Sequence, residues 1–185
     1  GAHAALAIEN ARLFEEARDA VRRLESTMAE VEAAVRVHEQ LIANVASGRG
    51  IEALADTLAS ALSAGVMILE PDDRVLCASA ERARGQRALV NAGAARRPLS
   101  LALEASRRSG HSEDVDMPAG ACRAMSIVGA GQTLGSLVVW RDRALSDFDT
   151  RTIERGALVA GAILLSRERI ARGLNHDFEE ALRGL

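Results

Sequence analysis

The chain has 185 residues, 48% of them hydrophobic, and a net charge of −3 from 23 basic and 26 acidic residues. This length allows one domain of ~100–150 residues with flanking helices, and it is short for two complete domains. With this net charge the chain has no overall positive field to attract nucleic acid, and an aromatic content of 2% leaves few side chains on which bases could stack. No apolar run approaches the ~20 residues that cross a bilayer.

The N-terminal 46 residues predict one long helix. Beyond Gly1 they contain neither Pro nor Gly, and they are rich in Ala, Glu, Arg and Leu. Their apolar residues recur at alternating spacings of three and four, which is the register of a coiled coil. An amphipathic helix that lies on its own domain is the alternative. The predicted homodimer contacts are Phe14, Val21, Leu24, Met28, Val31, Val35, His38 and Ile42.

Glycines at 48 and 50 break this helix, and a second helix is expected from Ile51 to about Leu62. The apolar run from Val66 to Leu69 predicts a strand, and Arg74 to Ser79 predicts the strand that returns beside it. Pro71-Asp72-Asp73 supplies the turn, since Pro presets the backbone angle and Asp caps it. These residues therefore predict a β-hairpin.

The segment from Glu81 to Arg97 has a poor hydrophobic face and is expected to be a short helix or a mobile cover. Pro98 is expected to open a clearer helix that runs through Arg108 and is closed by Gly110.

Three further strands are expected at 113–116, 121–128 and 133–140, and the last two are separated by Gly129-Ala130-Gly131-Gln132. Ser146 to Asp149 is expected to cap a final helix that extends through Ala181.

Three stretches carry a resemblance to a known family. AHAALAIENARLFEEA at 2–17 resembles the closing helix of a GAF domain, and GQTLGSLVVWRDRALSDFDTRTIERGALVAGAILL at 131–165 resembles the last strand and helix of one. VHEQLIANVASGRGIEALADTLASALSAGVMILEPDDRVLCAS at 37–79, with the tail RERIARGLNHDFEEALRGL, is similar to the sensory region of PucR/CdaR-like bacterial transcriptional regulators.

The resemblance implies an α+β fold, with a GAF/PAS-like antiparallel sheet and flanking helices. It implies a signalling helix at 1–46, a GAF-like sensory domain at 47–165 and a linker helix at 166–185. It also implies a helix-turn-helix output domain downstream, through which alone the protein would contact DNA. Two alternatives stay open, a dimerisation spacer without a ligand and the regulatory domain of a cyclase, phosphodiesterase or histidine kinase.

No catalytic or metal signature accompanies these elements. The sequence lacks a P-loop and a GxSxG elbow, and its four histidines have no partners at the spacings of a metal or phosphotransfer site. Two cysteines and no secretory signal indicate a cytoplasmic compartment. We therefore expect a cytoplasmic, non-enzymatic protein with no membrane anchor, no metal and no cofactor.

A sensory domain of this kind would hold a small molecule between its sheet and the segment from Glu81 to His111. The polar residues expected to contact an anionic ligand from that segment are Arg96, Arg97 and His111, and those expected on the strands are Ser79, Cys122 and Ser126. The identity of such a ligand is not encoded in these residues.

Overall fold

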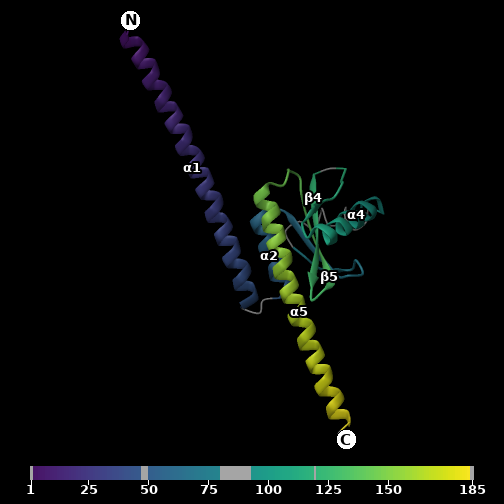
Figure 1. Cartoon of the computed structure of the whole chain (residues 1–185). Helices are drawn as coiled ribbons and strands as arrows, with labels where there is room; N and C mark the ends of the chain where they lie inside the picture. The colour runs from purple at the N-terminus through teal and green to yellow at the C-terminus, as the bar shows by residue number, and fades with distance from the viewer. Residues whose placement is uncertain (1, 47–49, 80–92, 119, 184–185) are drawn as a thin grey trace. The chain divides into compact units, whose positions relative to one another are not determined.

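The computed structural model describes residues 2–46, 50–79, 93–118 and 120–183 (Figure 1). The elements in chain order are α1 (Ala2–Ala46), α2 (Ile51–Leu62), β1 (Gly65–Leu69), β2 (Val75–Ala78), α4 (Gly93–Ser109), β3 (Glu113–Asp114), β4 (Ala121–Gly129), β5 (Gln132–Arg141) and α5 (Asp147–Arg183). The predicted α+β class with an antiparallel sheet and flanking helices is confirmed. The segment from Glu81 through residue 92, expected to be a short helix or a mobile cover, lies outside the described residues.

Two compact units make up the chain, Gly1–Arg36 and Val37–Leu185. The first unit is a single helix with exposed ion pairs one turn apart, such as Arg12 with Glu16 at 3.4 Å. Such pairs give a helix modest support of about 0.3–0.5 kcal/mol each. The second unit holds the sheet, the remaining helices and the last turns of α1.

The five strands are ordered β2-β1-β5-β4-β3, and each neighbouring pair is antiparallel. The β4–β5 hairpin turns at Ala130 and Gly131, whose φ angles are 51° and 77°. Positive φ at both central residues is the geometry whose twist matches that of paired strands, and Gly131 adopts it without a side-chain clash. The hairpin sets the register that places Arg123 opposite Val139 and Ala124 opposite Val138.

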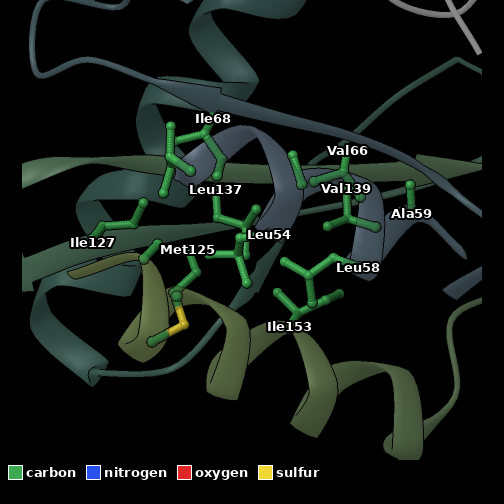
Figure 2. Close-up of a cluster of buried hydrophobic side chains, with 14 of the residues drawn as sticks. Leu54, Leu58, Ala59, Val66, Ile68, Met125, Ile127, Leu137, Val139 and Ile153 are labelled. Atoms are coloured by element: carbon green, nitrogen blue, oxygen red, sulfur yellow. The ribbon is translucent and has the colours of Figure 1, made fainter. Parts of the chain in front are cut away.

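One face of the sheet packs against α2 and α5 (Figure 1). Because side chains alternate along a strand, this face receives Val66 and Ile68 from β1, Met125 and Ile127 from β4, and Leu137 and Val139 from β5. Figure 2 shows these side chains meeting Leu54 and Leu58 of α2 and Ile153 of α5. The predicted apolar faces of both helices therefore form the main core.

The contact between α2 and α5 depends on a residue without a side chain. A Cβ atom at Gly156 would lie 2.7 Å from Leu58 Cδ1, closer than real Cβ contacts allow. The glycine lets the two helices approach until Leu58 is fully buried.

The other face of the sheet is covered by α4, which lies over β4 and β3. The expected start of this helix at Pro98 is wrong, because α4 begins at Gly93 and Pro98 lies inside it. Ala94, Ala95 and the two arginines after them are strong helix formers, and they add a turn before the proline despite the hydrogen bond that it cannot donate. The helix ends at Ser109, followed by Gly110 as expected.

A buried arginine joins three elements at one end of the main core. Arg141, the last residue of β5, donates from Nη1 to the Leu62 carbonyl at 2.9 Å and from Nε to the Arg143 carbonyl at 3.2 Å. Its Nη2 donates to the Ala144 carbonyl at 2.5 Å and to the Asp149 carboxylate. Leu62 ends α2, so the guanidinium also meets the negative end of that helix.

Asp149 completes this arrangement from the first turn of α5. Its Oδ2 accepts from the Ser146 backbone N–H at 2.7 Å and the Ser146 hydroxyl at 2.8 Å, while the Asp149 N–H donates back to the Ser146 Oγ at 3.2 Å. This reciprocal pattern is a capping box, so the predicted cap is confirmed. Burial alone would raise the pKa of Asp149, but the hydrogen bonds from Ser146 and Arg141 and the arginine's charge outweigh it and lower that pKa.

Replacing Asp149 by Ala should reduce the free energy of unfolding by about 3–5 kcal/mol, because it leaves the Arg141 guanidinium buried without a counter-charge. Urea unfolding at pH 7 measures the loss. Asp147→Ala, an exposed acid in the same helical turn, is the control and should cost far less.

The lowered pKa also sets the direction of a pH effect. The stabilisation by ionised Asp149 is fully present above the unfolded-state pKa of about 3.9 and is lost as the pH falls through the lower folded-state value. Between pH 7 and pH 3 the wild type should therefore lose more stability than Asp149→Asn. Equal losses of unfolding free energy for the two proteins would contradict a lowered pKa at Asp149.

Candidate functional site

The α4 side of the sheet carries a second, smaller cluster of buried side chains. Cys122, Ala124 and Ser126 project from β4 toward this side, and Met67 of β1 and Val138 of β5 lie beside them. The helix contributes Ala102 and Leu103, both buried. The sequence-predicted strand residues Cys122 and Ser126 therefore share one face of one strand, four residues apart, beneath α4.

Ser126 ties this helix to the sheet through two buried hydrogen bonds. Its hydroxyl donates to the Leu103 carbonyl at 3.0 Å, and its backbone N–H donates to Ser106 Oγ at 3.0 Å. Both partners lie on α4, one turn apart, so the bonds hold the helix at a fixed point above β4. The Ser126 hydroxyl proton is therefore already used within the protein.

Ser79 plays a similar local role after β2. Its backbone N–H donates to the Val66 carbonyl at 2.9 Å, and its Oγ accepts from the Val66 N–H at 3.2 Å. The residue is buried and extends the pairing of the edge strand β2 with its neighbour β1. Its expected contact with a ligand stays a prediction.

The cationic residues predicted around the ligand are more dispersed. Arg97 is exposed on α4, and the side chain of Arg96 lies outside the described residues. His111 follows α4 and is also exposed, with its Nδ1 3.2 Å from Glu154 Oε1 on α5. The structure thus directs His111 toward α5 and does not group it with Ser126.

Sequence reasoning missed a polar cluster at the β3 edge of the sheet. The Ser112 backbone N–H and hydroxyl donate to Glu154 Oε1 at 3.1 and 3.4 Å. Arg123 donates from Nη2 to the Ser112 carbonyl at 2.9 Å and from Nη1 to Thr150 Oγ1 at 2.7 Å. The sequence does show that Thr150 and Glu154 share one face of a helix, because they are one turn apart. It does not show their partners, which are distant in sequence.

The predicted coiled-coil seam is left exposed by its own chain. Phe14, Val21, Leu24, Met28, Val31, Val35 and Ile42 are each at least 50% exposed. The side chain of His38 lies outside the described residues. In the last turns of α1, Val37 packs against the main core and Leu41 is only 1% exposed. Neither belongs to the seam, so the domain uses a different side of the helix from the seam.

Neither a membrane-spanning helix nor a cluster of metal ligands occurs in the parts of the chain that the structure describes. Within these parts no helix combines the length and apolarity needed to cross a membrane. The same residues contain no group of three or more His, Cys, Asp or Glu side chains placed to hold a metal ion.

Both cysteines carry thiols with raised pKa values. Burial, reinforced by Glu52, raises the pKa of Cys77 to about 11, and burial with Asp114 nearby raises that of Cys122 to about 12. The Cys77 Sγ lies 3.7 Å from the Ile51 carbonyl oxygen and Cys122 is buried beneath α4. The reactive species is the thiolate, so neither residue is suited to act as a nucleophile or a redox sensor near neutral pH.

Alkylation by iodoacetamide at pH 8 should therefore be at least about a hundredfold slower for both folded thiols than for free cysteine. The thiolate fraction of each thiol should grow about tenfold per pH unit below its pKa. Mass spectrometry of peptides containing each residue measures the rates, with the urea-unfolded chain as the control. Rapid labelling of either folded thiol would contradict its assignment as an inert core residue.

Comparison with known proteins bears on the fold. No protein-family model matches the sequence, and no curated protein sequence is similar enough to count as a match. Among solved structures, the chain is similar to the GAF domain of a sensor histidine kinase from Pseudomonas syringae pv. tomato, with 17% identity, a TM-score of 0.53, and coverage of 85% of this chain and 99% of that one.

Two further structures are similar in the same way. The GAF domain of an Acinetobacter phosphoenolpyruvate-protein phosphotransferase has 8% identity, a TM-score of 0.50, and coverage of 77% of this chain and 97% of that one. The cofactor-binding GAF domain of the nutrient sensor CodY from Clostridium difficile has 17% identity, a TM-score of 0.44, and coverage of 71% and 94%. On the first two likenesses and on its own topology, the chain has the fold of a GAF domain.

Proposed function

We propose that this chain is a non-enzymatic sensory domain of a bacterial transcriptional regulator of the PucR/CdaR type. It binds a small molecule between α4 and the sheet, and it works as a homodimer that relays the bound state through its long helices. The observation that carries this proposal is the contrast between the two faces of the sheet.

The contrast is one of side-chain size and cover. The main core presents branched aliphatic residues such as Ile68, Leu137 and Val139 to two helices. The opposite face offers Cys122, Ala124 and Met67, and α4 is tied there to β4 through Ser126. A face that is covered by one helix and has a smaller set of apolar contacts than the main core suits a site that must open, admit a small molecule and close again.

The regulatory context rests on sequence and on fold. The stretch 37–79 and the C-terminal tail resemble the sensory region of PucR/CdaR-like regulators. The similar domain from Pseudomonas syringae is described as part of a sensor histidine kinase, which is a signalling protein. A fold by itself does not specify function, so the proposal depends on the tests below.

The absence of catalysis is part of the proposal. Among the described residues, the thiols have raised pKa values and the Ser126 hydroxyl donates to a backbone carbonyl. Neither these two thiols nor the Ser126 hydroxyl is activated by a neighbouring base in the way that nucleophilic catalysis requires. A domain of this kind acts through binding equilibria, and its output is limited to the ligand's differential affinity for two conformations.

The dimer follows from the exposed seam of α1. Seven apolar side chains along this seam are exposed while Val37 and Leu41, on another side of the helix, pack on the domain. A continuous apolar stripe of this length is rarely left in water by a monomeric protein. A second copy fits it because the heptad pattern is complementary to itself.

Val31→Asp or Val35→Asp should convert the dimer to a monomer, since each substitution places two carboxylates opposite each other in a desolvated seam. Sedimentation equilibrium measures the mass. Ser26→Asp adds the same charge at an exposed site outside the seam and should leave the dimer intact. An unchanged mass for wild type and all three variants would reject the seam.

The binding proposal is tested by thermal shift against purines, organic acids and sugar acids. A cognate compound at about a hundred times its dissociation constant should add roughly 2.7 kcal/mol to the free energy of unfolding. It should also slow hydrogen exchange in α4, which the ligand would cover.

Arg97→Ala should reduce the shift given by an anionic compound, whereas Arg108→Ala, an exposed arginine at the other end of α4, should not. If no compound shifts the transition and α4 is already as protected as β4 in the free protein, the domain is a dimerisation spacer.

A further inference from the structure

We infer that Ser112 and Glu154 form a mechanical connection between α4 and α5, by which a movement of the ligand-side helix reaches the output helix. The two helices pack on opposite faces of the sheet, and the connection joins them beside its β3 edge. The signal that this connection would carry rests on the proposed function. The existence of the connection does not.

Ser112 is held from both sides of its peptide backbone. Its N–H donates to Glu154 Oε1 of α5 at 3.1 Å, and its carbonyl accepts from Arg123 Nη2 at 2.9 Å. Arg123 donates in turn to Thr150 Oγ1 of α5 at 2.7 Å. Both constraints on Ser112 therefore lead to α5, and the contacts close a ring through residues 112, 123, 150 and 154.

The same short segment is attached to the end of α4. The Gly110 N–H donates to the Ser106 carbonyl at 2.8 Å, and Ser109 Oγ donates to Glu113 Oε1 at 2.8 Å while accepting from the His111 N–H at 3.1 Å. Only two residues, Gly110 and His111, separate the end of α4 from Ser112. Because this connecting segment is so short, a shift of α4 along its axis should displace the backbone at Ser112.

The ring is stiff enough to pass such a displacement on. Ser112 is buried, and its bonds involve a carboxylate and a guanidinium, which make stronger hydrogen bonds than neutral groups. Asp114 adds an ion pair, with its Oδ1 3.4 Å from Arg123 Nε, although the geometry is not that of a hydrogen bond. His111 Nδ1 adds a third contact to Glu154 Oε1 at 3.2 Å.

Ser106 lies at the other end of this path. It accepts from the Ser126 N–H on β4 and also supplies the carbonyl that binds Gly110. One residue therefore couples the seating of α4 on the sheet to the start of the connection. Loosening α4 at Ser106 should therefore reach α5 through Ser112, directly at Glu154 and also through Arg123 at Thr150.

Hydrogen exchange of the intact chain without any ligand tests this coupling. Glu154→Ala should speed exchange of the amides from the end of α4 to β3 by about fivefold or more, since the released segment opens locally. Glu154→Gln should restore part of the protection, because its amide oxygen can still accept from the Ser112 N–H. Glu104→Ala removes an exposed carboxylate on α4 itself and should have no such effect.

The decisive measurement is a double-mutant cycle read out at α5. Ser106→Ala should speed exchange of α5 amides around Glu154 by at least about twofold in the wild-type background and by clearly less in the Glu154→Ala background, where only the contact through Arg123 and Thr150 is left. Additive effects would overturn the inference. So would a uniform increase that includes β1 and β2, since it would mean that Glu154 contributes only to global stability.

The outcome is independent of the ligand screen. A coupled cycle with no ligand found would reject the sensory function and retain the connection. An uncoupled cycle with a ligand found would do the reverse.

Discussion

The buried pair of Arg141 and Asp149 is the constraint on which the main body of the domain depends. A guanidinium removed from water is costly unless every donor finds an acceptor, and here the acceptors are the end of α2, the loop after β5 and the first turn of α5. Both helices are therefore positioned relative to the last strand by one side chain. The apolar core between them forms only in that register.

The two faces of the sheet are packed in different ways. On the side of α2 and α5, Gly156 allows α5 to approach Leu58 closely, and the branched side chains of three strands fill the interface. On the other side α4 is held by directional bonds to Ser126 and by a smaller set of apolar contacts. Directional bonds can break and reform without repacking a core, which is what a covering helix needs if it is to move.

The long helices then give such a movement a route outward. α5 begins at the buried capping box, passes the polar ring at Thr150 and Glu154, and continues as a helix to Arg183. α1 brings its last turns to the same core through Val37 and Leu41 and leaves its seam available for a second copy. In the proposed function, sensing, dimerisation and output would therefore use different surfaces.

The sequence by itself determined the local elements, because their signals lie within a few neighbouring residues. Periodicity and turn chemistry predict the helix at Ile51–Leu62, the hairpins and the cap at Ser146. They place the start of α4 at Pro98, five residues late, because the helix formers before this proline extend the helix. The resemblance of stretches at both ends predicted the GAF fold. Only the tertiary structure decided that Arg141 reaches Leu62, 79 residues away, and that Ser112 meets Glu154 across 42 residues. Contacts of this kind depend on how strands and helices pack. The sequence around a charged or polar residue does not show whether its side chain will lie in solvent or in a buried hydrogen-bond network.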